Sequence, residues 1–186
     1  MRICHGGEKT GPRVLALGTF DGVHRGHQEL IRQGKLLAAE TGALLRVCVF
    51  DRHPLEVLDP RAAPRLLQTA EERNRIFAAL GADELRIIPF TRETAETEPE
   101  DFLKMLRSEC DLKGIVVGWN YTFGRRGRGT AELLRKMGES QGFTVLIVPP
   151  VKTGAGEIIS STAIREKLAR GDLAGARDML GNPGSN

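Results

Sequence analysis

The sequence predicts an α/β fold in which a doubly wound parallel sheet of about five strands carries helices on both faces. One reason is that short apolar runs, several rich in valine and isoleucine, alternate with longer stretches of helical periodicity. A chain of 186 residues of which 40% are hydrophobic is also large enough to bury a core of its own. We expect one domain over residues 1–186, with its core at about 13–150 and a short helical tail at about 160–181.

The apolar runs are bounded by turn residues, as buried strands of a parallel sheet are. The predicted strands are residues 14–18, 44–50, 85–90, 115–118 and 145–148. The predicted helices are residues 26–41, 70–80, 99–110 and 130–142, followed in the tail by 161–169 and 173–180. We expect the first dozen residues, which contain Gly6, Gly7, Gly11 and Pro12, and the last residues, 181–186, to be loosely held.

Composition excludes several classes of protein. A formal charge of +3 is too small to indicate a nucleic-acid-binding protein. No run reaches the roughly 18 apolar residues of a membrane span, and the start has no signal-peptide core. The three cysteines have no paired spacing, which fits reduced thiols and gives no metal-site pattern. We therefore expect a cytoplasmic protein with neither a nucleic-acid nor a membrane partner.

The turn after the first predicted strand has the features of an anion site. Glycines at 18, 22 and 26 let the backbone approach a ligand, and the next helix offers free N–H groups and its positive dipole end. His24 and His27 can point the same way and each donate an Nε2–H to one polyphosphate. The alternative is that the two histidines are ordinary polar residues at a helix cap, but this interpretation does not account for the spaced glycines. A zinc site would need more ligands than this neighbourhood supplies.

A second segment near the C-terminus has a similar character. Ser160, Ser161 and Thr162 place hydroxyl groups and backbone amides at a helix start. Arg165, one turn on, presents a planar guanidinium that suits phosphate oxygens. The alternative for this segment alone is a capped helix without a ligand.

These two segments carry a resemblance to known enzymes. Residues 18–27, Gly-Thr-Phe-Asp-Gly-Val-His-Arg-Gly-His, resemble the HxGH signature of the nucleotidylyltransferase superfamily, and residues 159–165, Ile-Ser-Ser-Thr-Ala-Ile-Arg, resemble its second signature. The spelling Phe-Asp-Gly-Val-His, with residues 50–54, 67–69, 117–124 and 171–181, resembles the FMN adenylyltransferase module of bacterial FAD synthetases. The resemblance implies a Rossmann-like sheet and transfer of AMP from ATP to FMN, giving FAD and pyrophosphate with Mg²⁺.

The resemblance also implies roles for individual residues. It implies that His24, His27 and Arg165 contact the ATP phosphates and that Asn120 stands near the reacting phosphates and the flavin. The implied ATP-binding residues are Gly18, Phe20, Asp21, Gly26, Ser160, Ser161 and Thr162. The implied FMN-binding residues are His53, Pro54, Asn120, Arg125 and Arg128. No protein metal ligand is expected, because magnesium bridges phosphates and keeps several waters.

The flavin candidates also have structural interpretations. Asn120 can end a strand in an Asx turn, residues 53–54 can form a plain turn, and the arginines at 125 and 128 can belong to a solvated loop. Tyr121 and Phe123 are expected to pack their loop. Arg52 replaces the first proline of the family's Phe-x-Pro-His-Pro, which leaves that loop less rigid and bears on flavin affinity more than on reaction type.

Two other functions stay open at this point. Polyol-phosphate cytidylyltransferases share both signatures, but typically carry Arg-Thr-Glu-Gly where residues 154–159 read Gly-Ala-Gly-Glu-Ile-Ile. A non-catalytic flavin- or nucleotide-binding paralogue is the second alternative. Bifunctional members of the family continue into a riboflavin kinase module beyond the point matching residues 180–183, so we expect no riboflavin kinase domain here and a separate riboflavin kinase as the source of FMN.

Overall fold

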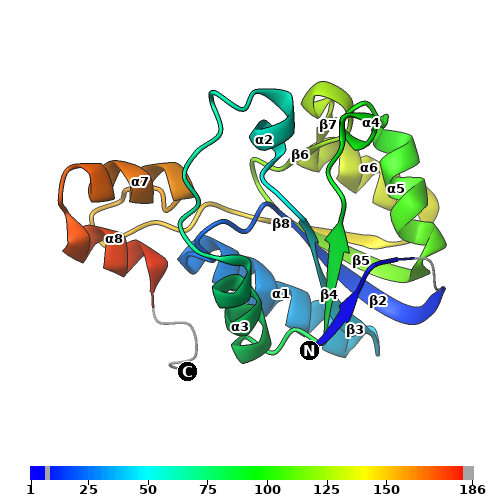
Figure 1. Ribbon diagram of the computed structural model, residues 1–186. Helices are drawn as coiled ribbons and strands as arrows, with labels where there is room; N and C mark the ends of the chain where they lie inside the picture. The colour runs from blue at the N-terminus through cyan, green and yellow to red at the C-terminus, as the bar shows by residue number, and fades with distance from the viewer. Residues whose placement is uncertain (7–8, 182–186) are drawn as a thin grey trace.

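The computed structural model describes residues 1–6 and 9–181 and confirms the predicted fold class (Figure 1). Its central sheet has six parallel strands in the order β1-β4-β3-β2-β5-β8. The strands are β1 (Arg2–Cys4), β2 (Thr10–Leu17), β3 (Leu44–Phe50), β4 (Glu84–Ile88), β5 (Cys110–Gly118) and β8 (Thr144–Val148). A separate antiparallel pair, β6 (Thr122–Phe123) and β7 (Gly129–Thr130), follows β5.

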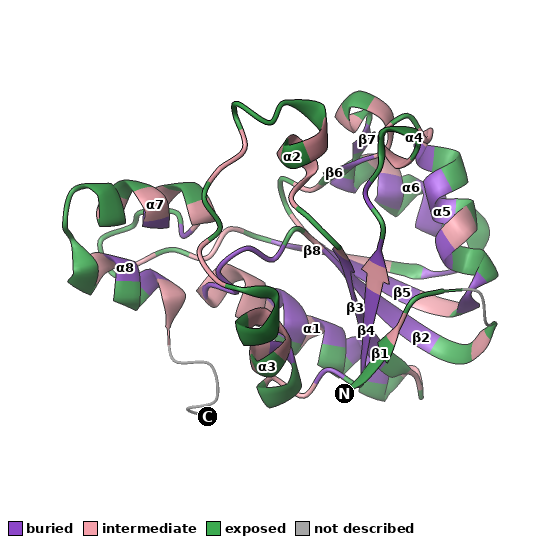
Figure 2. Cartoon of the chain, viewed as in Figure 1, coloured by how far each residue is buried: buried purple, intermediate pink, exposed green. Residues whose placement is uncertain are grey.

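Helices cover both faces of the sheet, and Figure 2 shows the buried residues where they meet it. On one face, α1 (Arg25–Glu40) and α3 (Ala70–Ala79) share an apolar core with β2, β3 and β4. On the other face, α5 (Pro99–Ser108) and α6 (Ala131–Gln141) pack on β2 and β5. The remaining helical segments are α2 (Pro54–Leu58), α4 (Arg92–Ala95), the 3₁₀ turn η1 (Arg125–Gly127), α7 (Ser161–Ala169) and α8 (Leu173–Leu180). The last two helices form the predicted tail around buried Ile164 and Met179.

The N-terminal segment differs from its expectation. Instead of a loosely held end, the structure has β1 at the sheet edge, parallel to β4, and β2 begins at Thr10. The three residues of β1 are too few to show periodicity, and a register irregularity between Thr10 and Pro12 lets β2 tolerate its proline. The expected loose C-terminal end, apart from Gly181, lies outside the described residues.

β5 also begins earlier than predicted, at Cys110, which the helical pattern had assigned to the preceding helix. Gly114 interrupts the apolar run, so the sequence signal starts only at Ile115. A side chain at Gly114 would lie 2.6 Å from the Leu37 side chain and 3.2 Å from the Thr144 carbonyl oxygen. Close packing of α1 and β8 against this strand therefore requires a glycine at position 114. The same glycine interrupts the apolar run, which is why the sequence pattern did not predict the first half of the strand.

The strand order places the loops where a ligand can bind. From β2 the chain proceeds outward through β3 and β4 on one side, and through β5 and β8 on the other. In such a sheet, the crevice lies between the carboxyl ends of the two strands where the direction reverses, here β2 and β5. The loops after Leu17 and Gly118 border that crevice.

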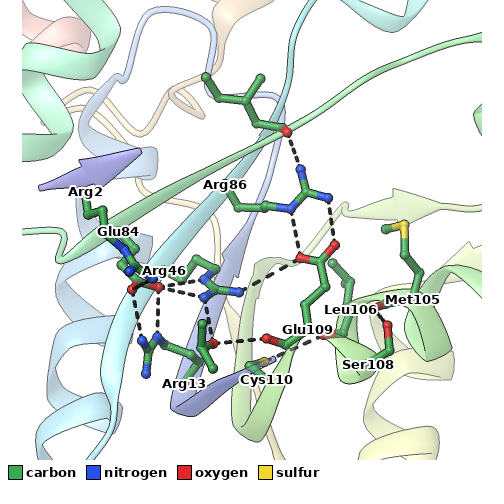
Figure 3. Close-up of polar contacts among 12 residues, drawn as sticks. Arg2, Arg13, Arg46, Glu84, Arg86, Met105, Leu106, Ser108, Glu109 and Cys110 are labelled. Carbon is green, nitrogen blue, oxygen red and sulfur yellow. Dashed lines mark hydrogen bonds and ion pairs between the residues drawn. The ribbon is translucent and has the colours of Figure 1, made fainter. Parts of the chain in front are cut away.

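A buried group of charges lies toward the amino ends of the strands, on the face covered by α5 and α6 (Figure 3). The Glu84 carboxylate accepts hydrogen bonds from Arg13 Nε at 2.8 Å and Arg46 Nε at 2.8 Å. Glu109 accepts two from Arg86, at 2.8 and 2.7 Å. The Arg13 hydrogen bond, above all, lowers the pKa of Glu84 to about 2. These buried ions link the neighbouring strands β2, β3 and β4 on this face of the sheet.

Among the residues that the structure describes, no helix combines the length and the apolar character needed to cross a membrane.

Candidate active site

The turn between β2 and α1 is held in an unusual backbone conformation. Phe20, Gly22 and Val23 all have positive φ angles, of 51°, 85° and 32°. This region suits glycine but strains a bulky or β-branched residue. Phe20 is fully buried against Phe77 of α3, with ring centroids 5.2 Å apart, and this packing keeps the strained turn in place.

The two histidines of the turn lie together at the start of α1. His24 is the N-cap residue, and its Nδ1 accepts a hydrogen bond from the His27 backbone N–H at 3.4 Å. The proton of the neutral His24 ring is therefore on Nε2, free for a ligand. The two rings stack with centroids 3.8 Å apart and planes at 16°. The stacking holds the two ring planes nearly parallel at the helix start.

Burial determines the charge of these rings. It lowers the pKa of His24 to about 4. It also lowers the pKa of His27 well below its ordinary value, and the nearby His24 lowers that pKa further. Both rings are neutral at pH 7, so they offer polarised N–H groups rather than positive charges. His27 Nδ1 is buried and has no hydrogen-bond partner among the described residues.

We expect the ring signals of His24 in a proton NMR titration to stay constant from pH 7.5 to 5.5 and to move only toward pH 4. Because the folded-state pKa lies below the ordinary value of 6.5, the unfolded chain binds more protons between pH 6.5 and 4. The free energy of unfolding should therefore fall as the pH decreases through this window. A His24 midpoint near 6.5 would contradict the buried neutral pair.

The second signature joins the first through Asp21. Ser160 caps α7, its Oγ accepting from the Ala163 N–H at 3.1 Å, and Ser161 Oγ donates to the Asp21 carbonyl oxygen at 2.7 Å. The buried Asp21 carboxylate forms an ion pair with the Arg165 guanidinium. Residues 140 positions apart therefore meet in one site.

Glycine and backbone contacts close this junction. A side chain at Gly26 would lie 3.1 Å from the His24 ring and 3.8 Å from the Ile159 carbonyl oxygen, so a larger residue here would press on the ring. Arg165 Nε donates to the Arg65 carbonyl oxygen at 2.9 Å. Thr162 is exposed at the start of α7. The structure brings the predicted ATP-site residues together, with the Arg165 guanidinium held by a carboxylate.

Asn120 is exposed in the loop after β5, at the other side of the crevice. The loop turns tightly there, because the Tyr121 N–H donates to the Gly118 carbonyl oxygen at 3.0 Å. Tyr121 stacks on Phe123 with centroids 5.8 Å apart, and both pack against the core beside α5 and α6, as predicted. Trp119 is 50% exposed beside Asn120.

His53 and Pro54 lie at the start of α2. His53 Nδ1 accepts from the Leu55 N–H at 3.2 Å and its own N–H donates to Glu56 Oε1 at 3.1 Å, so His53 caps the start of α2. Burial lowers the pKa of His53, while the charges of Asp21 and Arg165 act on it in opposite directions. His53, in the loop after β3, therefore lies within electrostatic range of the ion pair between the two signatures. The Arg52 guanidinium forms an ion pair with its neighbour Asp51, with Nη2 2.9 Å from Oδ2.

Arg125 and Arg128 have acidic partners that the sequence analysis did not identify. Arg125 Nε lies 2.6 Å from Glu96 and its Nη1 lies 3.5 Å from Glu98, while Arg128 Nη1 lies 3.6 Å from Glu98. A flavin phosphate would have to replace these carboxylates. Across the described parts of the chain, no three histidine, cysteine or acidic side chains gather in a way that would hold a metal ion.

Comparison with known proteins settles which nucleotidylyltransferase-like family this site represents. The family model described as "FAD synthetase" matches residues 7–163, which include both signatures except for the last two residues of the second. The chain belongs to the FAD synthetase family. This membership confirms the resemblance carried by residues 18–27 and 159–165.

Relatives in the FAD synthetase family show how the chain compares in length. It is 36% identical over 172 residues to the "Bifunctional riboflavin kinase/FMN adenylyltransferase" of Listeria monocytogenes, covering 92% of this chain and 54% of the relative. It is 34% identical to the "FAD synthetase" of the same organism, covering 91% and 69%. The chain thus spans about half the length of the bifunctional relatives it matches.

A solved structure shares the fold of this FAD synthetase family member. It is described as "Crystal Structure of Macrolide-efflux Protein from Streptococcus pneumoniae" and is 31% identical, with a TM-score of 0.79. The match covers 91% of this chain and 55% of the other.

Proposed function

We propose that the chain is an FMN adenylyltransferase, which transfers AMP from ATP to FMN and releases pyrophosphate and FAD. The observation that carries this proposal is the junction at Asp21, where Ser161 and Arg165 of one signature meet the strained turn of the other. The names of the relatives, FMN adenylyltransferase and FAD synthetase, support FMN as the acceptor. The same names favour neither the cytidylyltransferase nor the binding-paralogue alternative.

In the proposed reaction, an oxygen of the FMN phosphate attacks the α-phosphorus of ATP. A new P–O bond forms to FMN as the bond to the pyrophosphate leaving group breaks. The FMN phosphate is already ionised at neutral pH, so the chain needs neither a nucleophile nor a general base. The work of the protein is to position the two phosphates and to stabilise the negative charge that develops.

The residues of the site suit that work. The N–H groups at the start of α1 and the neutral rings of His24 and His27 provide donors aimed at a polyphosphate. Arg165 joins them when a phosphate replaces Asp21 as its partner. Asn120, with both a donor and an acceptor, would bridge the two substrates, and His53, Pro54, Arg125 and Arg128 would enclose FMN. A magnesium ion, held mainly by phosphate oxygens and water, would neutralise part of the charge.

The test is to incubate the purified protein with magnesium, FMN and either ATP or CTP, and to measure FAD and pyrophosphate by chromatography. FAD and pyrophosphate in equal amounts, from ATP only, is the expected result. Turnover of glycerol phosphate with CTP would indicate the cytidylyltransferase, and thermal stabilisation by FMN or ATP without any product would indicate the binding paralogue. We further propose that a riboflavin kinase activity supplies the FMN, so riboflavin replacing FMN should give no FAD in this assay.

A further inference from the structure

Arg73 lies outside both signatures, yet α3 carries it to the same site. The start of α3 is fastened to the first signature, because the Leu67 N–H donates to Asp21 Oδ1 at 2.9 Å and Gln68 Nε2 donates to the Phe20 carbonyl oxygen at 3.3 Å. Arg73 follows in the next turn and lies one helical turn before Phe77, the residue that packs against Phe20. Arg73 and Phe77 therefore share the face of α3 that is directed at the signature turn.

The guanidinium of Arg73 is partly buried and incompletely paired. Its Nε is buried and has no hydrogen-bond partner among the described residues. Burial lowers the pKa of Arg73, and the Asp21 carboxylate is close enough to oppose that effect. A desolvated cation without a full set of partners costs folding free energy, so its retention calls for a compensating anion.

The other charges of the site leave Arg73 in excess. Asp21 and Arg165 neutralise each other as an ion pair, and burial keeps His24 and His27 uncharged. Within this set of groups, Arg73 supplies the one unbalanced formal charge, alongside the partial positive charge at the start of α1. The attraction of these groups for a multiply charged anion therefore depends strongly on Arg73.

We propose that Arg73 is a substrate-binding residue whose guanidinium binds the polyphosphate of the nucleotide. A polyphosphate oxygen would give Nε its missing acceptor and balance the charge of the buried group. The proposal rests on the proposed function only for the identity of the anion as ATP. Binding of a polyphosphate itself requires neither FMN nor catalysis, and the two proposals can therefore fail separately.

The test compares Arg73→Gln with Arg75→Gln. Arg75 is on the same helix, is exposed and loses the same charge, so it is a matched control. We would measure binding of inorganic tripolyphosphate and of ATP by calorimetry without FMN. Arg73→Gln should weaken both by about tenfold or more, the loss expected for charge-assisted hydrogen bonds, and Arg75→Gln by less than about twofold. Arg73→Lys, which keeps the charge without the planar fork, should fall between them.

The melting temperature of the ligand-free protein separates binding from a structural role. Removing a partly buried cation whose Nε has no hydrogen-bond partner among the described residues should raise it in Arg73→Gln, whereas loss of a structural contact would lower it. The inference is overturned if wild type does not bind tripolyphosphate, if Arg73→Gln binds it as tightly as Arg75→Gln does, or if ligand-free Arg73→Gln melts below wild type. If binding depends on Arg73 but wild type makes no FAD, the proposed function fails and the role of Arg73 stands.

Discussion

Replacing His27 with alanine is expected to lower the turnover of ATP and FMN by roughly ten- to a thousand-fold, the range for loss of one preorganised donor to a developing charge. The structure gives the reason. His27 stacks on His24 at the start of α1, is neutral because it is buried, and offers its ring without the cost of reorienting it during the reaction. The measurement is steady-state FAD formation at saturating substrates.

The control for His27 must separate chemistry from packing, because the ring also lies 5.1 Å from the Phe20 ring. His27→Asn keeps an N–H donor of smaller size and should retain more activity than His27→Ala. Both variants should bind ATP and melt cooperatively. Turnover of His27→Ala equal to wild type would refute the role of the ring, and an equal loss in both variants together with a large drop in melting temperature would assign the effect to packing.

Glu84→Gln is expected to lower the free energy of unfolding by about 3–5 kcal/mol, the usual cost of removing one member of a buried ion pair. Glu84 accepts hydrogen bonds from Arg13 and Arg46 and also pairs with Arg2 at 3.0 Å. Glutamine has nearly the same shape, but it leaves two buried guanidinium groups without their counter-ion. Urea unfolding followed by circular dichroism measures the change.

Asp111→Asn is the matched control, because its carboxylate pairs with Lys113 at 2.8 Å on the surface and should contribute no more than about 1 kcal/mol. The pH dependence gives a second check. The pKa of Glu84 is about 2 in the folded chain against an ordinary 4.5, so its contribution is complete above pH 4.5 and is lost as the pH falls toward 2. The difference in free energy of unfolding between wild type and Glu84→Gln should shrink over that interval. A difference that stays constant would show that the stabilisation does not come from the charge of Glu84.

The ion pair between Asp21 and Arg165 has a consequence for how the site works. In this structure the arginine expected to bind phosphate is held by a carboxylate, and Arg125 and Arg128 are held by Glu96 and Glu98. In the proposed reaction, each substrate would therefore exchange protein carboxylates for its own phosphate oxygens. Such exchange favours phosphate groups over chloride, because a phosphate replaces both the charge and the hydrogen bonds at once.

Local sequence was sufficient for most of the architecture. The strand at 44–50 and the tail helices at 161–169 and 173–180 have the predicted bounds, because an apolar run or a 3.6-residue period within one segment determines them. The two signatures were also visible in the sequence, since spaced glycines and histidines at a strand-to-helix turn are a local requirement of phosphate binding. β1 was missed because it is stabilised by pairing with β4, which is distant in the sequence.

The charge states of the site were decided by the tertiary structure alone. Composition cannot show that His24 is neutral, that Asp21 holds Arg165, or that Glu84 is buried between arginines 71 and 38 residues away. Arg73 belongs to no signature, and only the contact of α3 with the first turn brings it there. The sequence by itself determined which segments form the site. Burial and long-range pairing, which depend on how those segments pack, determined which of its groups carry charge.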